Sequence, residues 1–250
     1  RGHHTLCGTL HSTSFDPGGF AEYVRVPKIN VDKGGILPLP EDISFDVGTF
    51  VEPLGCAVRG LRRIGMQPGD SVLVLGSGLA GLLNIRLARA LGTGCIVATD
   101  IQPYRLQAAL NSGARTVIDA RSENVVEQAL AANDGNGFEH VVVCTPASVA
   151  FPQALSGVGV GGNVLLYAFS GPGAETPLDL HDYFRKGITI RSTYGASPLD
   201  LQQAMKMLRV GRVDVEDLIT HRLPLEETGL GFTLVANGEE SLKVIIEPGR

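Results

Sequence analysis

The sequence predicts an α/β protein built on a doubly wound parallel sheet. Short apolar runs recur between residues 71 and 192, and stretches with apolar residues at helical spacing separate them. Strands that alternate with helices form right-handed βαβ units, whose parallel sheet is covered on both faces. Six runs fit the six strands of such a sheet. The predicted strands are Ser71–Gly76, Cys95–Asp100, Arg115–Ala120, His140–Thr145, Gly162–Ala168 and Gly187–Ser192.

Local signals place the helices between these strands. The apolar positions from Leu79 to Leu91 fall on one helical face, and glycines follow them. Residues 103–113 begin with proline and end with glycine, which are favoured in the first turn of a helix and just past its end. Ser122 is a candidate N-cap for a third helix that runs through Ala132.

The two flanks differ from this central pattern. Residues 1–50 are rich in glycine and proline, and Phe20–Pro27 alternates between polar and apolar side chains like a strand, which predicts part of a different, β-rich domain. From residue 199 onward the pattern predicts a helix, a strand over 218–225, another helix and a last strand over 243–248.

Composition excludes some partners. The chain has 250 residues, of which 44% are apolar, enough for one large domain or two small ones. Its net charge of -5 and scattered basic residues argue against a nucleic-acid partner. No apolar stretch reaches the roughly 18–20 residues that span a bilayer, so no membrane partner is expected. The four cysteines lie far apart without a C-x-x-C pair, which predicts a reduced, cytoplasmic protein.

A glycine motif stands where the first strand meets the first helix. GSGLAG fits G-x-G-x-x-G in the strand–turn–helix context that binds dinucleotides. The first glycine permits the tight turn, the second lets a pyrophosphate approach the backbone, and the third lets helix and strand pack closely. The phosphates would accept hydrogen bonds from free N–H groups at the helix N-terminus. The alternative is a glycine-rich turn that binds nothing. The predicted cofactor-binding residues here are Gly76, Gly78, Leu79, Ala80 and Gly81.

An acid follows at the end of the second strand. Asp100 lies 19 residues after Gly81, where a carboxylate accepts hydrogen bonds from the adenosine ribose and repels a 2′-phosphate. The glycine motif together with Asp100 predicts NAD rather than NADP as the cofactor. Arg105 is a candidate for the same ribose, or else a solvated side chain. Asp100 has its own alternative, as a cap of the next turn. A methyltransferase is a rival class, but residues 143–148 offer no acidic or Asn-Pro-Pro element.

Five stretches carry a family resemblance. They are GGFAEYVRVP (18–27), VEPLGCAVRGL (51–61), PGDSVLVLGSGLAGLL (68–83), DLITHRLPLEE (217–227) and SLKVIIEPGR (241–250). Together they resemble the zinc-containing medium-chain dehydrogenases of the alcohol dehydrogenase superfamily, and more narrowly their sorbitol and threonine dehydrogenase branch. The resemblance covers essentially the whole chain.

The resemblance implies a domain organisation. Residues 1–52 would be the remnant of a GroES-like catalytic domain, residues 53–193 the NAD-binding Rossmann domain, and residues 194–250 the return into the catalytic domain. RGHHTLC resembles the end of the family's structural zinc motif, so Arg1 is expected to be the cut edge of a longer, N-terminally truncated chain. A homodimer or homotetramer is implied as well.

The resemblance also implies two residues near zinc. Glu52 precedes Pro53 and Leu54 as in the family's E-P-L, where the acid is a ligand of the catalytic zinc or is hydrogen-bonded to the zinc-bound water. A carboxylate there balances the metal's charge and orients the bound oxygen. Cys7 would be the fourth ligand of the structural zinc. Taken alone, Glu52 is an acid in the first turn of a helix, stabilised by the helix dipole.

Further cofactor contacts are expected at the carboxyl ends of later strands. Thr145 follows the fourth strand, and Ala168 to Ser170 follow the fifth, where a nicotinamide would lie. Lys243 is similar to a basic residue that reaches the cofactor phosphates in the family.

These observations predict an NAD-dependent, zinc-containing alcohol or polyol dehydrogenase, acting on a secondary alcohol or an amino alcohol. In the intact enzyme zinc would act as the Lewis acid, and hydride would pass to NAD. One alternative is a catalytically inert NAD-binding module. Another is a zinc-free, quinone reductase-like member of the same superfamily. We expect these 250 residues to bind NADH better than NADPH and to lack dehydrogenase activity alone.

Overall fold

The computed structural model describes residues 4–12, 15–168, 171–238 and 240–249. Of the expected nicotinamide contacts, Phe169 and Ser170 lie outside the described residues. The chain forms two compact units. One consists of residues 56–193, and the other joins residues 1–55 to residues 194–250.

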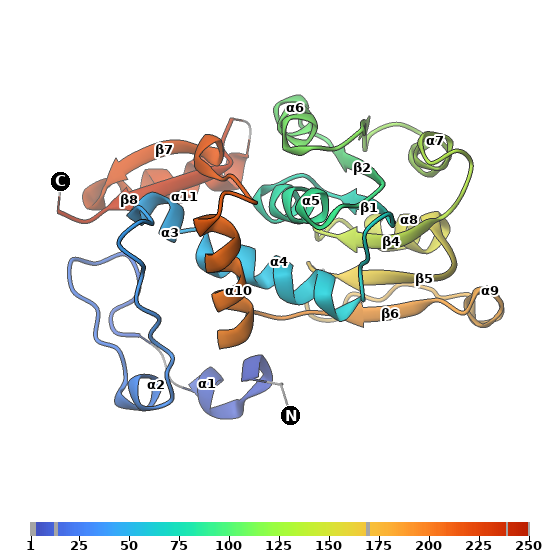
Figure 1. The fold of residues 1–250 in the computed structure, drawn as a ribbon. Coiled ribbons are helices and arrows are strands. Elements are labelled where there is room, and N and C mark those ends of the chain that lie inside the picture. Colours follow the sequence, from blue (N-terminus) through green and yellow to red (C-terminus); the bar gives the residue numbers. More distant parts are fainter. Residues whose placement is uncertain (1–3, 13–14, 169–170, 239, 250) are drawn as a thin grey trace. The chain divides into compact units, whose positions relative to one another are not determined.

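The unit of residues 56–193 contains a six-stranded sheet in which every neighbouring pair is parallel (Figure 1). The strand order β3-β2-β1-β4-β5-β6 places the first strand in the middle, which is the doubly wound topology. The predicted fold class is therefore confirmed. The strands are β1 (Ser71–Leu75), β2 (Cys95–Asp100), β3 (Thr116–Asp119), β4 (Phe138–Val143), β5 (Val158–Leu166) and β6 (Thr189–Ser192).

Helices alternate with these strands and cover both faces of the sheet. They are α5 (Leu79–Leu91), α6 (Pro103–Ser112), α7 (Val125–Ala132), α8 (Ala150–Gly157) and α9 (Leu180–Lys186). Gly92 and Gly113 end α5 and α6 in the left-handed conformation, as their positions in the sequence predict. The predicted N-cap Ser122 is wrong. The Ser122 amide closes a turn onto the Asp119 carbonyl, so the cap position of α7 falls to Asn124.

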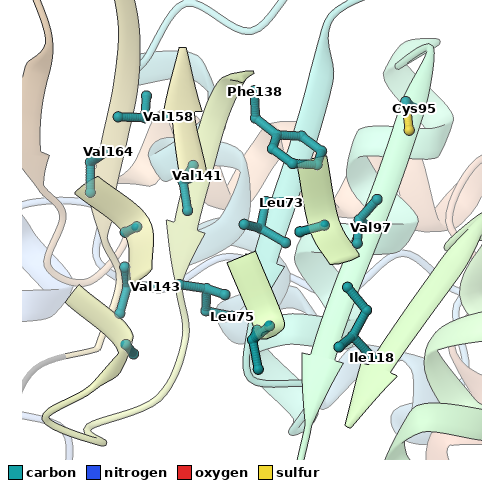
Figure 2. Close-up of a cluster of buried hydrophobic side chains, with 14 of the residues drawn as sticks. Leu73, Leu75, Cys95, Val97, Ile118, Phe138, Val141, Val143, Val158 and Val164 are labelled. Carbon is teal, nitrogen blue, oxygen red and sulfur yellow. The ribbon is translucent and has the colours of Figure 1, made fainter. Parts of the chain in front are cut away.

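One buried hydrophobic cluster of this unit lies between the sheet and the pair α7 and α8. Leu73, Val97 and Val141 point to the same face, because they are in register on the neighbouring strands β1, β2 and β4. Ala129 and Ala154 contribute small side chains from the helices, which let the helices approach the sheet. Figure 2 shows much of this cluster, with the Phe138 ring among the side chains of neighbouring strands.

The other unit combines both ends of the chain. Within the described ranges its one sheet consists of two parallel strands, β7 (Ile219–Pro224) and β8 (Lys243–Glu247). Helix α11 (Thr228–Asn237) packs against both strands. The remaining helices are α1 (Gly8–Ser12), α2 (Lys28–Asp32), α3 (Phe45–Gly48), α10 (Pro198–Arg209) and the short 3₁₀ helices His4–Leu6, Glu216–Leu218 and Leu225–Glu227. Helix α4 (Val51–Arg63) begins in this unit and ends in the other.

The predicted strand over Phe20–Pro27 is wrong in this structure. Its Arg25 makes an isolated antiparallel bridge with Asp16, and Arg25 and Asp16 exchange backbone hydrogen bonds of 2.8 and 3.2 Å. A strand needs a neighbour along its whole length, and this segment meets one at a single residue pair. Among the helices of the described residues, none is long and apolar enough to cross a bilayer.

Replacing Phe138 by alanine tests the core. Phe138 is fully buried, so Phe138→Ala leaves a cavity and is expected to lower the free energy of unfolding by about 3–5 kcal/mol. Phe184→Ala is the matched control, because that ring is 83% exposed; its change should stay within about 0.5 kcal/mol. Urea denaturation measures both. Equal losses in the two variants would contradict the assignment of the core.

A two-bond ion pair joins distant parts of the two-ended unit. Nη1 and Nη2 of Arg222 on β7 donate to Oδ1 and Oδ2 of Asp46 on α3, at 2.7 and 2.5 Å. The hydrogen bond from Arg222 lowers the pKa of Asp46 below its ordinary value. Arg222 also donates to Glu247 on β8 at 3.4 Å. The pair therefore fixes residue 46 to a strand that lies far along the chain.

Asp46→Asn is expected to change the acid sensitivity of the protein. A folded pKa below the unfolded value stabilises the protein above about pH 4 and is lost as pH falls through the folded pKa. At pH 7 the variant should be less stable by at most about 1 kcal/mol, because both side chains are about one-third exposed. The difference should shrink as pH falls through the folded pKa of Asp46. Denaturation at a series of pH values from 7 downward measures it, and a gap that is independent of pH would refute the role of this pair.

Candidate cofactor site

The glycine motif forms a tight turn between β1 and α5. Gly76 has a φ of 94°, which favours glycine, and its amide donates to the Thr99 carbonyl at 3.0 Å. A Cβ atom on Gly76 would lie 2.9 Å from the Cβ of Thr145, so the turn packs against the residues that follow β4. The third glycine is tighter still. A Cβ on Gly81 would lie 2.0 Å from the Gly76 carbonyl oxygen.

Gly78 differs from the other two glycines of the motif. It occupies the N-cap position of α5, and a Cβ placed on it would meet no atom within 4 Å. Leu79 and Ala80 follow as the first residues of the helix. The open space beside Gly78 and the N-terminal amides of α5 together form a cradle of the kind that binds phosphate groups.

Asp100 lies beside this turn at the end of β2. Its side chain is buried, and its Oδ2 accepts from the Ser77 amide at 2.8 Å while its Oδ1 accepts from the Gln102 amide at 3.0 Å. Each oxygen keeps a second lone pair for another donor. Arg105 is half-buried on α6, and its Nε atom has no hydrogen-bond partner among the described residues. The two predicted ribose residues are thus close in the chain: Asp100 ends β2, and Arg105 lies on the helix that follows, α6.

A hollow of about 440 Å³ opens at the carboxyl ends of β4 and β5. Thr145 and Ala168, both expected near a nicotinamide, line it. Sequence reasoning named Ala168 to Ser170 in the loop beyond β5 but missed the lining residues that follow them, although their position after a strand of the sheet was the available signal. The hollow is also lined by Val143, Ala147, Ser148, Phe151, Leu166, Gly171, Pro172, Ala174 and Thr176.

The thiol that directly follows β4 is a packing group. Cys144 directly follows β4, and its Sγ lies 3.7 Å from the Nδ2 of Asn84, which donates to it. Burial raises the pKa of the Cys144 thiol, so it stays protonated and is a poor nucleophile.

Lys243 and Glu52 belong to the two-ended unit. The Lys243 Nζ donates to the Thr49 carbonyl at 3.3 Å and lies 5.1 Å from the centroid of the Phe50 ring. Burial lowers the pKa of Lys243, against the opposing effect of the negative charge of Glu52. The expected contact of Lys243 with the cofactor phosphates stays a prediction. In the structure Lys243 contacts the two residues that precede α4, and Glu52 is exposed in the first turn of that helix.

The described residues do not by themselves form a zinc site. Cys7 is exposed between the 3₁₀ helix His4–Leu6 and α1. In the described ranges, no group of three or more His, Cys, Asp or Glu side chains gathers in a way that would hold a metal. The zinc roles of Glu52 and Cys7 stay predictions, and no catalytic step through zinc is derived from this geometry.

A family model described as zinc-binding dehydrogenase matches residues 80–209. Two curated relatives are L-threonine 3-dehydrogenases. The protein from Bacillus velezensis is 33% identical over 99% of this chain and 70% of its own length. The protein from Bacillus licheniformis is 32% identical over 92% of this chain. This chain spans only 64% of that second relative.

Solved structures agree with these matches. An alcohol dehydrogenase from Thermus sp. ATN1 is similar with a TM-score of 0.78 and 31% identity, covering 84% of this chain and 60% of that one. A zinc-binding dehydrogenase from Sinorhizobium meliloti, bound to NADP, reaches a TM-score of 0.82 at 26% identity, covering 92% and 66%.

Gly81→Ala tests the tight packing of the turn. The added methyl group would meet the backbone oxygen of Gly76, which cannot rotate away as a side chain would. We expect a loss of about 1–3 kcal/mol in the free energy of unfolding. Gly229→Ala is the control, because a Cβ on this residue of α11 meets nothing within 4 Å. Thermal and urea denaturation measure both, and an unchanged stability of Gly81→Ala would contradict the geometry.

Proposed function

Because the chain belongs to the zinc-binding dehydrogenase family, we propose that residues 56–193 bind NAD at the carboxyl edge of the six-stranded sheet. The observation that carries this proposal is the pairing of an open glycine cradle with a buried carboxylate. Gly78 leaves room at the N-terminus of α5, and Asp100 lies one hydrogen bond away from the same turn.

Each group has a place for one part of the cofactor. The pyrophosphate would accept hydrogen bonds from the amides that follow Gly78, at the positive end of the α5 dipole. The adenosine ribose would donate its hydroxyls to the remaining lone pairs of Asp100, and Arg105 would contact the same ribose. The nicotinamide would lie toward Thr145 and the hollow beside it.

The charge of Asp100 supports NAD over NADP. A 2′-phosphate would approach a buried carboxylate whose two oxygens already hold backbone amides, so the side chain cannot turn away without losing both bonds. Like charges brought together at a binding surface cost several kcal/mol. Arg105 would offset part of that repulsion.

We place the chain within an enzyme that transfers hydride between NAD and a secondary alcohol. The nicotinamide supplies the hydride chemistry when bound, and the protein supplies position and electrostatics. The relatives named L-threonine 3-dehydrogenase act on a hydroxyl carried by an amino acid, which supports a polyol or amino alcohol as the substrate. Zinc at Glu52 and Cys7, a homodimer or homotetramer, and a cytoplasmic location belong to the same proposal for the intact protein.

The alternatives separate by experiment. A catalytically inert NAD-binding module would bind NADH as strongly and oxidise no alcohol even in the complete chain. A zinc-free quinone reductase-like protein would keep its activity in the presence of a chelator. The match to a zinc-binding dehydrogenase model favours the alcohol dehydrogenase.

Fluorescence titration with NADH and NADPH tests the cofactor site. We expect NADH to bind at least about tenfold more tightly than NADPH, a difference of about 1.4 kcal/mol. Gly78→Ala should lower NADH affinity by a similar factor, because its methyl group fills the open space at the helix N-terminus. Its stability should change by less than about 0.5 kcal/mol. Tighter binding of NADPH, or undiminished NADH binding by Gly78→Ala, would overturn the proposed site.

A further inference from the structure

We propose that Asp100 is also a positioning residue for the pyrophosphate, because its carboxylate holds the glycine turn in the shape that binds phosphate. This inference rests on the proposed NAD site and goes beyond ribose recognition. The Asp100 carboxylate and Ser77 together are called the turn bracket below.

The carboxylate joins two segments that are far apart in the sequence. Oδ2 accepts from the amide of Ser77, which lies between the first two glycines of the motif, at 2.8 Å. Oδ1 accepts from the amide of Gln102 at 3.0 Å, in the loop that leads from β2 to α6. Only 6% of Asp100 is exposed, so water competes poorly for these bonds. Hydrogen bonds to a charged acceptor are the stronger kind.

Ser77 completes the bracket with its side chain. It is fully buried, and its Oγ donates to the Thr99 carbonyl at 3.1 Å. The Gly76 amide donates to the same carbonyl at 3.0 Å. The turn is thus attached to the end of β2 by the amides of residues 76 and 77 and by one hydroxyl. The next residue, Gly78, borders the open cradle.

The turn bracket orders the backbone amides that would bind phosphate. Without the bracket, the backbone at Gly78 would be free to sample shapes in which its amides no longer converge on a phosphate, and binding would have to restore the order. Asparagine cannot replace the aspartate, because it offers one oxygen and one NH₂ group where two backbone amides both need an acceptor. Ribose and phosphate recognition therefore depend on one side chain.

A thermodynamic cycle separates the two roles. NADH and an NADH analogue whose adenosine ribose is 2′,3′-dideoxy are titrated into the wild-type chain and Asp100→Asn. The analogue has no hydroxyl for residue 100 to bind. If the bracket positions the phosphate cradle, Asp100→Asn should still weaken binding of the analogue by about tenfold, the size expected for one charge-assisted hydrogen bond. Equal or tighter binding of the analogue by Asp100→Asn would overturn the proposal.

Ser77→Ala provides a second variant with the carboxylate intact. It removes the hydrogen bond to Thr99 and leaves ribose recognition in place. We expect it to weaken NADH and the dideoxy analogue by the same factor, about two- to tenfold. A loss confined to NADH, or no loss for either ligand, would contradict the bracket.

Hydrogen exchange of the backbone amides tests the turn bracket in the absence of cofactor. Peptides that contain Ser77 should exchange faster in Asp100→Asn than in the wild type, while peptides from β4 stay unchanged. Asp119→Asn is the matched control, because Asp119 ends the neighbouring strand β3 and also accepts a backbone amide, from Arg121 at 2.9 Å. Unchanged exchange at Ser77 would refute the bracket. If the wild type bound neither ligand, the proposed function would fail, and the exchange data would show separately whether the bracket exists.

Discussion

Six parallel strands, ordered around β1, bring the parts of the candidate site to one edge of the sheet. Because β1 pairs with β2 on one side and β4 on the other, their carboxyl ends meet at one edge of the sheet. Gly76, Asp100 and Thr145 each follow one of these strands or end it, so three segments separated by some twenty to forty-five residues come together. The α7–α8 core holds that alignment, since a strand that slipped by one residue would turn Leu73 and its neighbours to the opposite face.

The candidate site owes its shape to backbone proximity more than to side chains. Gly76 and Gly81 are so close that a single carbon atom would not fit between them, and Gly78 faces open space a few atoms away. The carboxylate of Asp100 holds the turn through the Ser77 amide and keeps lone pairs for a ligand. A site of this kind is preorganised, because the groups that would contact the phosphate are fixed before the cofactor arrives.

In the unit that joins residues 1–55 to residues 194–250, ion pairs and a hydrogen bond connect the two parts of the chain. Arg222 and Arg209, both late in the sequence, form ion pairs with Asp46 and Asp42, and Lys243 bonds to the carbonyl of Thr49. Each of these contacts reaches the segment that leads into α4. The segment that leads into α4, whose first turn carries the exposed Glu52, is therefore held by residues of α10, β7 and β8. A metal role for Glu52 in the intact protein would depend on the same contacts.

The order of strands and helices in the central unit and the place of the glycine turn could be predicted, because they follow from local periodicity and from glycine and proline at helix ends. Prediction from the sequence failed for segments whose structure depends on pairing with another part of the chain. Residues 20–27 alternate like a strand but find a neighbour only at Arg25, and β5 begins at Val158, among glycines that conceal its start. The bracket between Ser77 and Asp100 and the contact of Lys243 with Phe50 were decided by tertiary structure alone, because they join residues whose separation along the chain carries no local signal.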